Sequence, residues 1–177
     1  MSTSIPYNPK TAALLVIDMQ EIFRNDATDI IPNVQSLVKS CHEKGVPVFW
    51  TQHGHRNPEF DGGALGRWRS QTSLDTLDFI IKSKTRYDAF YKTELNSLLI
   101  SLGIETLIIS GVRTNLCCET TARRGFDKNY DIVFIKDATA TENQKMHEAT
   151  LLNMEYGWAK IVTAIDVIEW LAHIGKT

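Results

Sequence analysis

Side chains with the chemistry of a nucleophilic site stand at the ends of three apolar runs of this sequence. Asp18 closes the first run, Lys84 follows the third, and the adjacent Cys117 and Cys118 follow the fourth. In such a site a carboxylate takes the proton of a thiol, an ammonium group stabilises and orients the negative charges, and the sulfur attacks an electrophilic carbon. These residue types therefore favour cysteine-based nucleophilic catalysis.

The two cysteines stand where the first turn of a helix is expected, directly after the predicted strand 106–112. Free backbone N–H groups and the positive end of the helix dipole meet there, so we expect a thiol in this turn to be shifted toward its thiolate form. Glu119 lies in the same turn and would disfavour an anion if it faced the site. The alternative is that both cysteines are buried core residues.

Short apolar runs alternate with segments of helical periodicity along the whole chain. The predicted strands are 12–19, 46–52, 78–82, 106–112, 131–136 and 159–164, and the predicted helices are 31–44, 93–102, 117–128, 141–156 and 167–174. This alternation predicts an α/β fold, a three-layer doubly wound (Rossmann-like) arrangement with a mostly parallel six-stranded sheet and helices on both faces. Ligands of such sheets bind beyond the carboxyl ends of the strands, where the candidate residues stand.

Helix 141–156 is expected to begin with a capping pair formed by Thr141 and Gln144. The segment from His53 to Thr76 has no clear periodicity, and a loop of this size is usually functional, such as a lid or an oligomer contact.

Length, charge and cysteine content restrict the class of protein. The 177 residues fit a single domain, 1–177, and the net charge of -2 without a basic stripe gives no reason to expect nucleic acid or a membrane surface as a partner. The longest apolar runs are strand-sized, and Met1 to Lys10 lacks the apolar core of a signal peptide. Three cysteines, two of them adjacent, are typical of a reduced, cytoplasmic protein.

Three motifs, in order and at matching spacing, resemble the isochorismatase-like cysteine hydrolases. They are Leu15 to Gln20 (LVIDMQ), Lys84 to Phe90 (KTRYDAF) and Gly111 to Cys117 (GVRTNLC). The similarity continues through Glu119 to Arg123 and Asp137-Ala138, so it extends over residues 12–140.

The resemblance implies a catalytic triad of Asp18, Lys84 and Cys117. It also implies a non-proline cis peptide bond between Val112 and Arg113, which directs backbone N–H groups, including that of Cys117, into an oxyanion hole. Cys118, turned about 100° away along a helix, is then expected to pack in the core.

The sequence differs from two groups of this family at residues that matter for their reactions, and these differences restrict the activity that we expect. True isochorismatases carry glycine where Cys117 stands and hydrolyse a vinyl ether without a covalent intermediate, so Cys117 argues against that reaction. Nicotinamidases keep the triad and add a metal site, an Asp-x-His pair followed by another histidine. Here His53 stands in place of the aspartate, and after His55 no histidine appears before the third strand. We therefore expect no metal ion or other cofactor, although His53 and His55 stay open as ligands.

The expected function is hydrolysis of a small amide, ureido or carbamoyl C–N bond through a thioester on Cys117. The partner is a small-molecule substrate, and the family suggests a homo-oligomer. Candidate substrate contacts are Phe23, Trp50, Tyr87, Phe90 and Arg113, with Arg67, Trp68 and Arg69 of the long loop as further candidates. The motif Lys84 to Phe90 has Asp88 where the family usually has serine, a change without an evident consequence.

Other classes stay open. Besides vinyl ether hydrolysis and nicotinamidase activity, the adjacent cysteines suit a redox-sensing thiol protein, and an intact triad can be idle in a storage protein of the same fold. A signalling receiver domain is also doubly wound, but it needs an acidic pair after its first strand. Met19 and Gln20 follow Asp18 instead.

Overall fold

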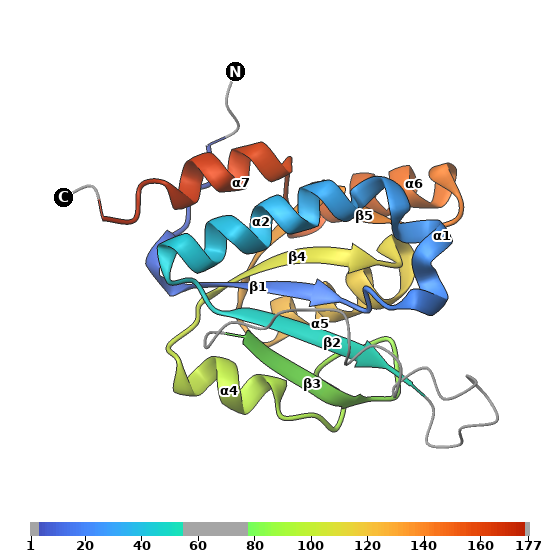
Figure 1. Cartoon of the computed structure of the whole chain (residues 1–177), viewed down its shortest axis with the longest axis horizontal. Helices are drawn as coiled ribbons and strands as arrows, with labels where there is room; N and C mark the ends of the chain where they lie inside the picture. The colour runs from blue at the N-terminus through green and yellow to red at the C-terminus, as the bar shows by residue number, and fades with distance from the viewer. Residues whose placement is uncertain (1–3, 55–77, 176–177) are drawn as a thin grey trace.

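Six parallel strands form one sheet in the order β3-β2-β1-β4-β5-β6 in the computed structural model, which describes residues 4–54 and 78–175 (Figure 1). The strands are β1 Ala12–Ile17, β2 Val48–His53, β3 Asp78–Lys84, β4 Thr106–Val112, β5 Asp131–Ala140 and β6 Lys160–Val162. The predicted six-stranded α/β fold is confirmed. The strand order reverses between β1 and β4, which is where sheets of this kind bind ligands.

Helices cover both faces of the sheet. They are α1 Arg24–Ala27, α2 Ile31–Lys44, α4 Leu95–Ser101, α5 Glu119–Asp127, α6 Gln144–Gly157 and α7 Ala164–Leu171. Shorter turns are the 3-10 segments η1 Pro9–Thr11, η2 Glu21–Phe23 and η3 Thr28–Ile30, and the π-helical turn η5 Thr114–Cys118. No helix among the described residues is long and apolar enough to cross a membrane.

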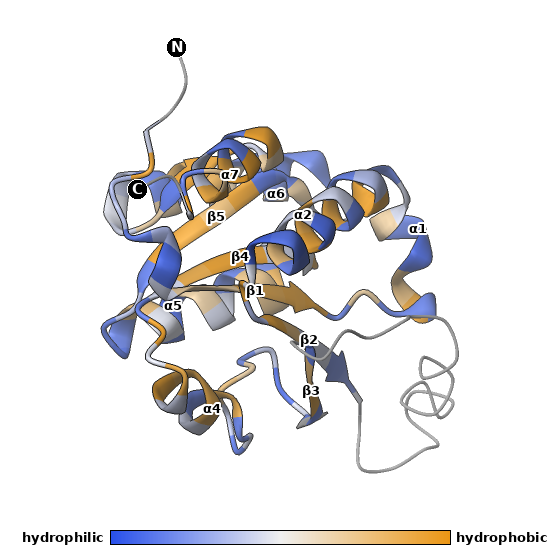
Figure 2. Cartoon of the chain, turned by 60° about the vertical axis from the view of Figure 1, so that its left-hand side comes forward, coloured by the Kyte–Doolittle hydropathy of each residue, from blue (hydrophilic) through white to orange (hydrophobic). Residues whose placement is uncertain are grey.

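Alternate residues of β1 point into two hydrophobic cores, one on each face of the sheet. Leu14 and Val16 pack toward α2 and α7, whereas Leu15 and Ile17 pack toward α4, α5 and α6. Every residue of β1 is buried, which explains why this strand is a continuous apolar run in the sequence. Figure 2 shows the hydrophobic colouring concentrated in the central strands, while the helices around them are of mixed colouring.

Two predicted strand ends are wrong in ways that affect the site. β1 stops at Ile17 rather than at residue 19, because Asp18 turns into the left-handed region with φ 49°. β3 continues to Lys84 instead of ending at residue 82, so the lysine belongs to the strand itself. Pairing of His53 with Lys84 extends the β2–β3 ladder to this point.

Capping side chains explain two wrong helix starts. The side chain of Asn143 accepts hydrogen bonds from the backbone N–H groups of Lys145 and Met146, so α6 begins at Gln144 rather than at a capping pair with Thr141. α7 begins at Ala164, not residue 167, because Thr163 and Asp166 form a capping box.

Gly111 allows β4 to approach β1 at the end of the sheet where the site lies. It pairs with Ile17 and has φ 108°, a conformation that side chains rarely adopt. A Cβ atom at this position would lie 2.1 Å from the backbone oxygen of Ile17. Any larger residue must therefore push apart the two strands that carry the candidate nucleophile and base.

We expect Gly111→Ala to lower the free energy of unfolding by about 3 kcal/mol or more, because backbone strain and a backbone clash coincide. Urea denaturation measures the effect. Gly157→Ala is the matched control, since open space surrounds this glycine at the end of α6, and alanine there should change stability by no more than about 1 kcal/mol. Equal stabilities of the two variants would contradict the assigned role of Gly111.

Candidate active site

Asp18 is held immediately after β1 by a threonine of the neighbouring strand. The backbone N–H of Asp18 donates to Thr51 Oγ1 at 3.1 Å, and the Thr51 hydroxyl donates to Asp18 Oδ1 at 2.6 Å. Both side chains are buried. One hydroxyl thus fixes the backbone and the carboxylate of a residue whose left-handed conformation is unfavourable for a residue other than glycine.

Lys84 brings its ammonium group to the centre of the site. Its side chain is fully buried, and Nζ lies 2.5 Å from Asp18 Oδ2 and 3.3 Å from Cys117 Sγ. Burial by itself would lower the pKa of Lys84, but the charges of Asp18 and Cys117 and their hydrogen bonds raise it above its usual value. The lysine is therefore a cation that joins the carboxylate to the sulfur.

Cys117 lies in the π-helical turn η5, which follows a cis peptide bond between Val112 and Arg113. The cis bond confirms the expectation from the family resemblance. The backbone N–H groups of Leu116 and Cys118 both donate to the carbonyl oxygen of Arg113 at 3.1 Å. The predicted helix start at Cys117 is wrong by two residues, because α5 begins at Glu119 after this wider turn.

The expectation that the turn favours a thiolate at Cys117 is also wrong. Burial, followed by the nearby Asp18, raises the pKa of the Cys117 thiol to about 12, and the opposing effect of Lys84 is smaller. Asp18 raises this pKa through its negative charge and through a hydrogen bond with the thiol. The resting form is thus a thiol beside a carboxylate, and its proton can pass to Asp18 when the sulfur attacks.

The neighbours of Cys117 point elsewhere. Cys118 is fully buried in the core on the α5 side of the sheet, as expected, and burial raises the pKa of its thiol. The carboxylate of Glu119 forms an ion pair with Arg123 at 2.8 Å and accepts a hydrogen bond from Thr150. The negative charge of Glu119 is therefore engaged along α5 and α6, away from the Asp18–Lys84 pair.

The aromatic residues predicted to contact substrate separate into two groups. Trp50 and Phe90 are buried in the two hydrophobic cores, and Phe90 stacks on Tyr130 with ring centroids 6.1 Å apart. Phe23 is partly buried after β1, and Tyr87 is 49% exposed, with its ring centroid 6.4 Å from that of His53. Phe23 and Tyr87 are thus the two of these four aromatic residues that keep substantial exposed surface.

Arg113 is engaged by two carboxylates. Its Nε donates to Asp26 Oδ2 at 2.9 Å, and its Nη1 lies 3.2 Å from Glu142 Oε2. These contacts join η5 to α1 and to the connection between β5 and α6. Arg67, Trp68, Arg69 and the predicted lid or oligomer contact of the long loop lie outside the described residues.

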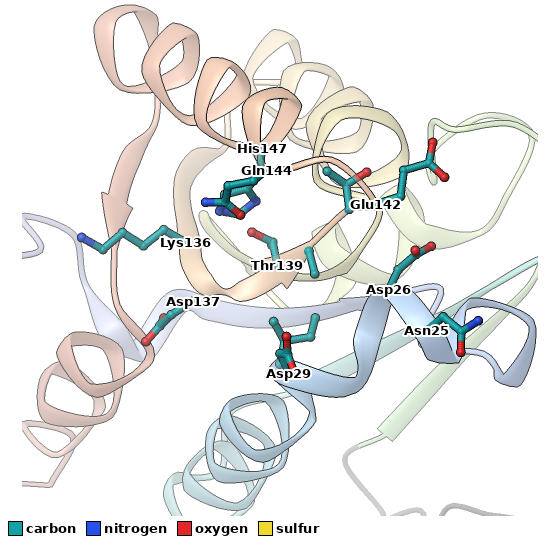
Figure 3. A pocket seen from close by; sticks show the side chains of 12 residues that line it. Asn25, Asp26, Asp29, Lys136, Asp137, Thr139, Glu142, Gln144 and His147 are labelled. Carbon is teal, nitrogen blue, oxygen red and sulfur yellow. The ribbon is translucent and has the colours of Figure 1, made fainter.

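A cavity of about 440 Å³ lies between α1, η3 and the β5–α6 connection (Figure 3). Its lining includes the two carboxylates that bind Arg113, Asp26 and Glu142, and the ring of His147. His147 Nδ1 lies 2.8 Å from the hydroxyl of Thr114, the first residue of η5, and burial lowers the pKa of this histidine. The lining does not include Asp18, Lys84 or Cys117, and the contact of His147 with Thr114 links the cavity to η5.

Three potential metal-ligand atoms, one each from Asp18, His53 and Cys117, lie within 4.8 Å of one another. The ammonium of Lys84 is within hydrogen-bond distance of all three residues, so a cation already occupies the position that they surround. These described residues do not fit a divalent metal ion, which would meet a like charge there. His55 lies outside the described residues.

Residues at the carboxyl end of β2 are the part of the site that the sequence motifs did not reveal. Besides Thr51, the backbone N–H of His53 donates to Gln20 Oε1 at 2.8 Å, and Gln20 Nε2 donates to the His53 carbonyl at 3.0 Å. Strand pairing could have indicated these residues. Because β2 is parallel to β1 and pairs with it, the carboxyl end of β2 must lie beside Asp18.

Comparisons with known proteins identify a family, related sequences and solved structures of the same fold. A model of the isochorismatase domain matches residues 12–166. Nicotinamidase 3 of Arabidopsis thaliana is 44% identical over 171 residues, covering 88% of this chain and 86% of the relative. The ureidoacrylate amidohydrolase RutB of Enterobacter sp. is 31% identical over 206 residues, covering 90% and 89%. A crystal structure of a cysteine hydrolase from Pseudomonas syringae, 22% identical, shares the fold with a TM-score of 0.82 over 98% of both chains.

Replacing Asp18 by asparagine should make Cys117 more reactive toward alkylation while abolishing catalysis that depends on the base. Without the carboxylate, only burial still opposes the stabilisation of the thiolate by Lys84, so iodoacetamide should label Cys117 about tenfold faster or more at pH 8. Mass spectrometry of the Cys117 peptide measures the rate. Lys84→Met should have the opposite effect, and slower labelling in Asp18→Asn would contradict the assignment.

Because its buried thiols have raised pKa values, we expect the free energy of unfolding of the protein to fall at alkaline pH. Burial raises the pKa of both Cys41 and Cys117 to about 12, so these thiols stay protonated in the folded protein while they ionise in the unfolded chain above about pH 9. The unfolded chain then binds fewer protons, and the free energy of unfolding should fall by up to about 1.4 kcal/mol per pH unit for each thiol. Urea denaturation between pH 8 and 10.5 tests this. A Cys41→Ala/Cys117→Ala variant with an undiminished decline would refute the cause.

Proposed function

The chain belongs to the isochorismatase family, and we propose that it is a cysteine hydrolase that cleaves the C–N bond of a small amide through a thioester on Cys117. The observation that carries this proposal is the contact of one buried ammonium, Lys84 Nζ, with both Asp18 and Cys117. The proposed domain is the whole chain, 1–177, supported by a family match that covers residues 12–166.

In the first half of the proposed reaction, Asp18 takes the thiol proton as Cys117 Sγ bonds to the amide carbon. The carbonyl oxygen becomes an oxyanion, for which the backbone around the Val112–Arg113 bond and the N–H of Cys117 are the proposed donors. The protonated Asp18 then gives its proton to the leaving nitrogen. The C–N bond breaks, ammonia or an amine departs, and a thioester remains.

In the second half, Asp18 takes a proton from a water molecule while the water oxygen attacks the thioester carbon. The C–S bond breaks, the carboxylic acid leaves, and the proton on Asp18 returns to the sulfur. Lys84 remains an ammonium throughout, consistent with the raised pKa that Asp18 and Cys117 produce despite burial. Its positive charge offsets the carboxylate of Asp18 in the resting state. It also offsets the negative charge that develops on the sulfur when the thiol loses its proton and when the C–S bond breaks.

For the substrate we propose a neutral amide, with nicotinamide as the first compound to test. A relative that is 44% identical is named a nicotinamidase, so the lack of an aspartate at position 53 does not remove this activity from consideration. Asp26 and Glu142 already neutralise Arg113, which favours a substrate without a carboxylate at that position. The exposed parts of Phe23 and Tyr87 are the proposed walls for a planar ring.

Ureidoacrylate is the second candidate, on the strength of the relative that is 31% identical and named a ureidoacrylate amidohydrolase. We further propose a cytoplasmic homo-oligomer. The three free, buried cysteines are consistent with a reducing compartment, and Leu152 and Tyr156, 69% and 94% exposed on α6, supply apolar surface for contact with a second copy.

The purified protein should release ammonia from nicotinamide, ureidoacrylate or both, and Cys117→Ala should lower kcat by about a thousandfold or more. Cys41→Ala is the matched control, because Cys41 is also buried with a thiol pKa of about 12 but lies on α2. This variant should retain activity within about threefold. Hydrolysis by Cys117→Ala at the rate of the Cys41 variant would refute covalent catalysis by Cys117.

A further inference from the structure

The ammonium of Lys84 has three N–H bonds and three partners. Two are the catalytic partners, Asp18 and Cys117, and the third is Nδ1 of His53 at 3.1 Å. An ammonium group can only donate hydrogen bonds. Nδ1 must therefore be the acceptor, which places the ring proton of a neutral His53 on Nε2.

The His53 ring is held in this orientation by several elements. Its backbone N–H and carbonyl both bond to the side chain of Gln20, which lies in the segment after Asp18. The β2–β3 register pairs His53 directly with Lys84. On its other side, the ring lies at 27° to that of Tyr87, with centroids 6.4 Å apart. Strand pairing and an amide clamp thus direct Nδ1 toward the ammonium.

The absence of charge on this third acceptor matters for the nucleophile. The nitrogen of His53 and the sulfur of Cys117 are within 4.8 Å of each other, so a negative charge at position 53 would act directly on the thiol. A carboxylate there would satisfy the ammonium but would also hold the proton on sulfur more tightly. A neutral imidazole completes the hydrogen bonds of Lys84 and leaves Asp18 as the anion beside the thiol.

We propose that His53 is a positioning residue: its neutral imidazole fixes the Lys84 ammonium between Asp18 and Cys117 as the third hydrogen-bond acceptor. This rests on the proposed function, because the reaction that it serves is attack by Cys117. The proposal makes His53 a hydrogen-bond acceptor for Lys84, in place of the metal-ligand role that the sequence left open.

Three substitutions test the proposal. His53→Asn places an amide oxygen close to the position of Nδ1, His53→Ala removes the acceptor, and His53→Asp replaces it with a charged one. On nicotinamide or ureidoacrylate, His53→Ala should lower kcat about ten- to a hundredfold with KM within about threefold, and His53→Asn should retain kcat within about fivefold.

Alkylation of Cys117 supplies a readout that needs no substrate. At pH 8, iodoacetamide should label Cys117 in His53→Asp about tenfold more slowly than in His53→Asn, because the added carboxylate favours the neutral thiol. Asparagine should leave the rate close to that of the wild-type protein. Thermal unfolding of each variant identifies any that fails to fold, and the Asn–Asp pair, nearly equal in size, carries the comparison in that case.

Three results would overturn the proposal. Equal labelling of the Asn and Asp variants would show that position 53 does not act on the thiol. A change confined to KM would make His53 a substrate contact. Loss of wild-type turnover on dialysis against a chelator, restored by zinc, would make it a metal ligand. If the wild-type protein hydrolyses none of the amides, the proposed function fails, while the labelling series still decides the role of His53.

Discussion

A single buried cation organises the candidate active site. Lys84 is fully enclosed, and its ammonium is shared among a carboxylate, a thiol and an imidazole that come from three different parts of the chain. Removing such a charge from water costs several kcal/mol, and the charges and hydrogen bonds of its partners offset this cost for the ammonium while those partners are themselves taken out of water. A buried ion pair of this kind is weak evidence for stability. Its position beside a nucleophilic sulfur makes catalysis the better explanation for its presence.

The fold supplies this arrangement through the ends of adjacent strands. β1 and β4 meet where the sheet order reverses, and Gly111 lets them approach at the level of Asp18. The left-handed backbone of Asp18 and its bonds to Thr51 direct the carboxylate, while the π-helical turn after β4 presents Cys117. Strained or irregular backbone therefore occurs where the chemistry requires it, whereas β1 itself is regular and fully buried.

The sequence sufficed for the sheet, for the convergence of Asp18, Lys84 and Cys117 and for the cis peptide bond, because each depends on local pattern or on motif order. It failed where long-range contacts decide. The helix dipole suggested a thiolate at Cys117, but burial and Asp18, 99 residues away in the chain, reverse the direction of its pKa. The ion pairs of Arg113 with Asp26 and Glu142 also join distant segments and had no local signal, and its contact with a substrate stays a prediction. His53 was considered only as a metal ligand, since no local pattern indicates that its ring faces Lys84.

The central claim is that the sulfur of Cys117 becomes covalently bonded to the acyl group during turnover. Rapid quenching of the protein in acid during hydrolysis of an active amide, followed by mass spectrometry of its peptides, tests this claim directly. The account predicts a mass increase equal to the acyl group on the peptide that contains Cys117, removable by hydroxylamine and absent in Cys117→Ala. Ammonia release with no adduct, in a pre-steady-state series that resolves the first turnover, would contradict it.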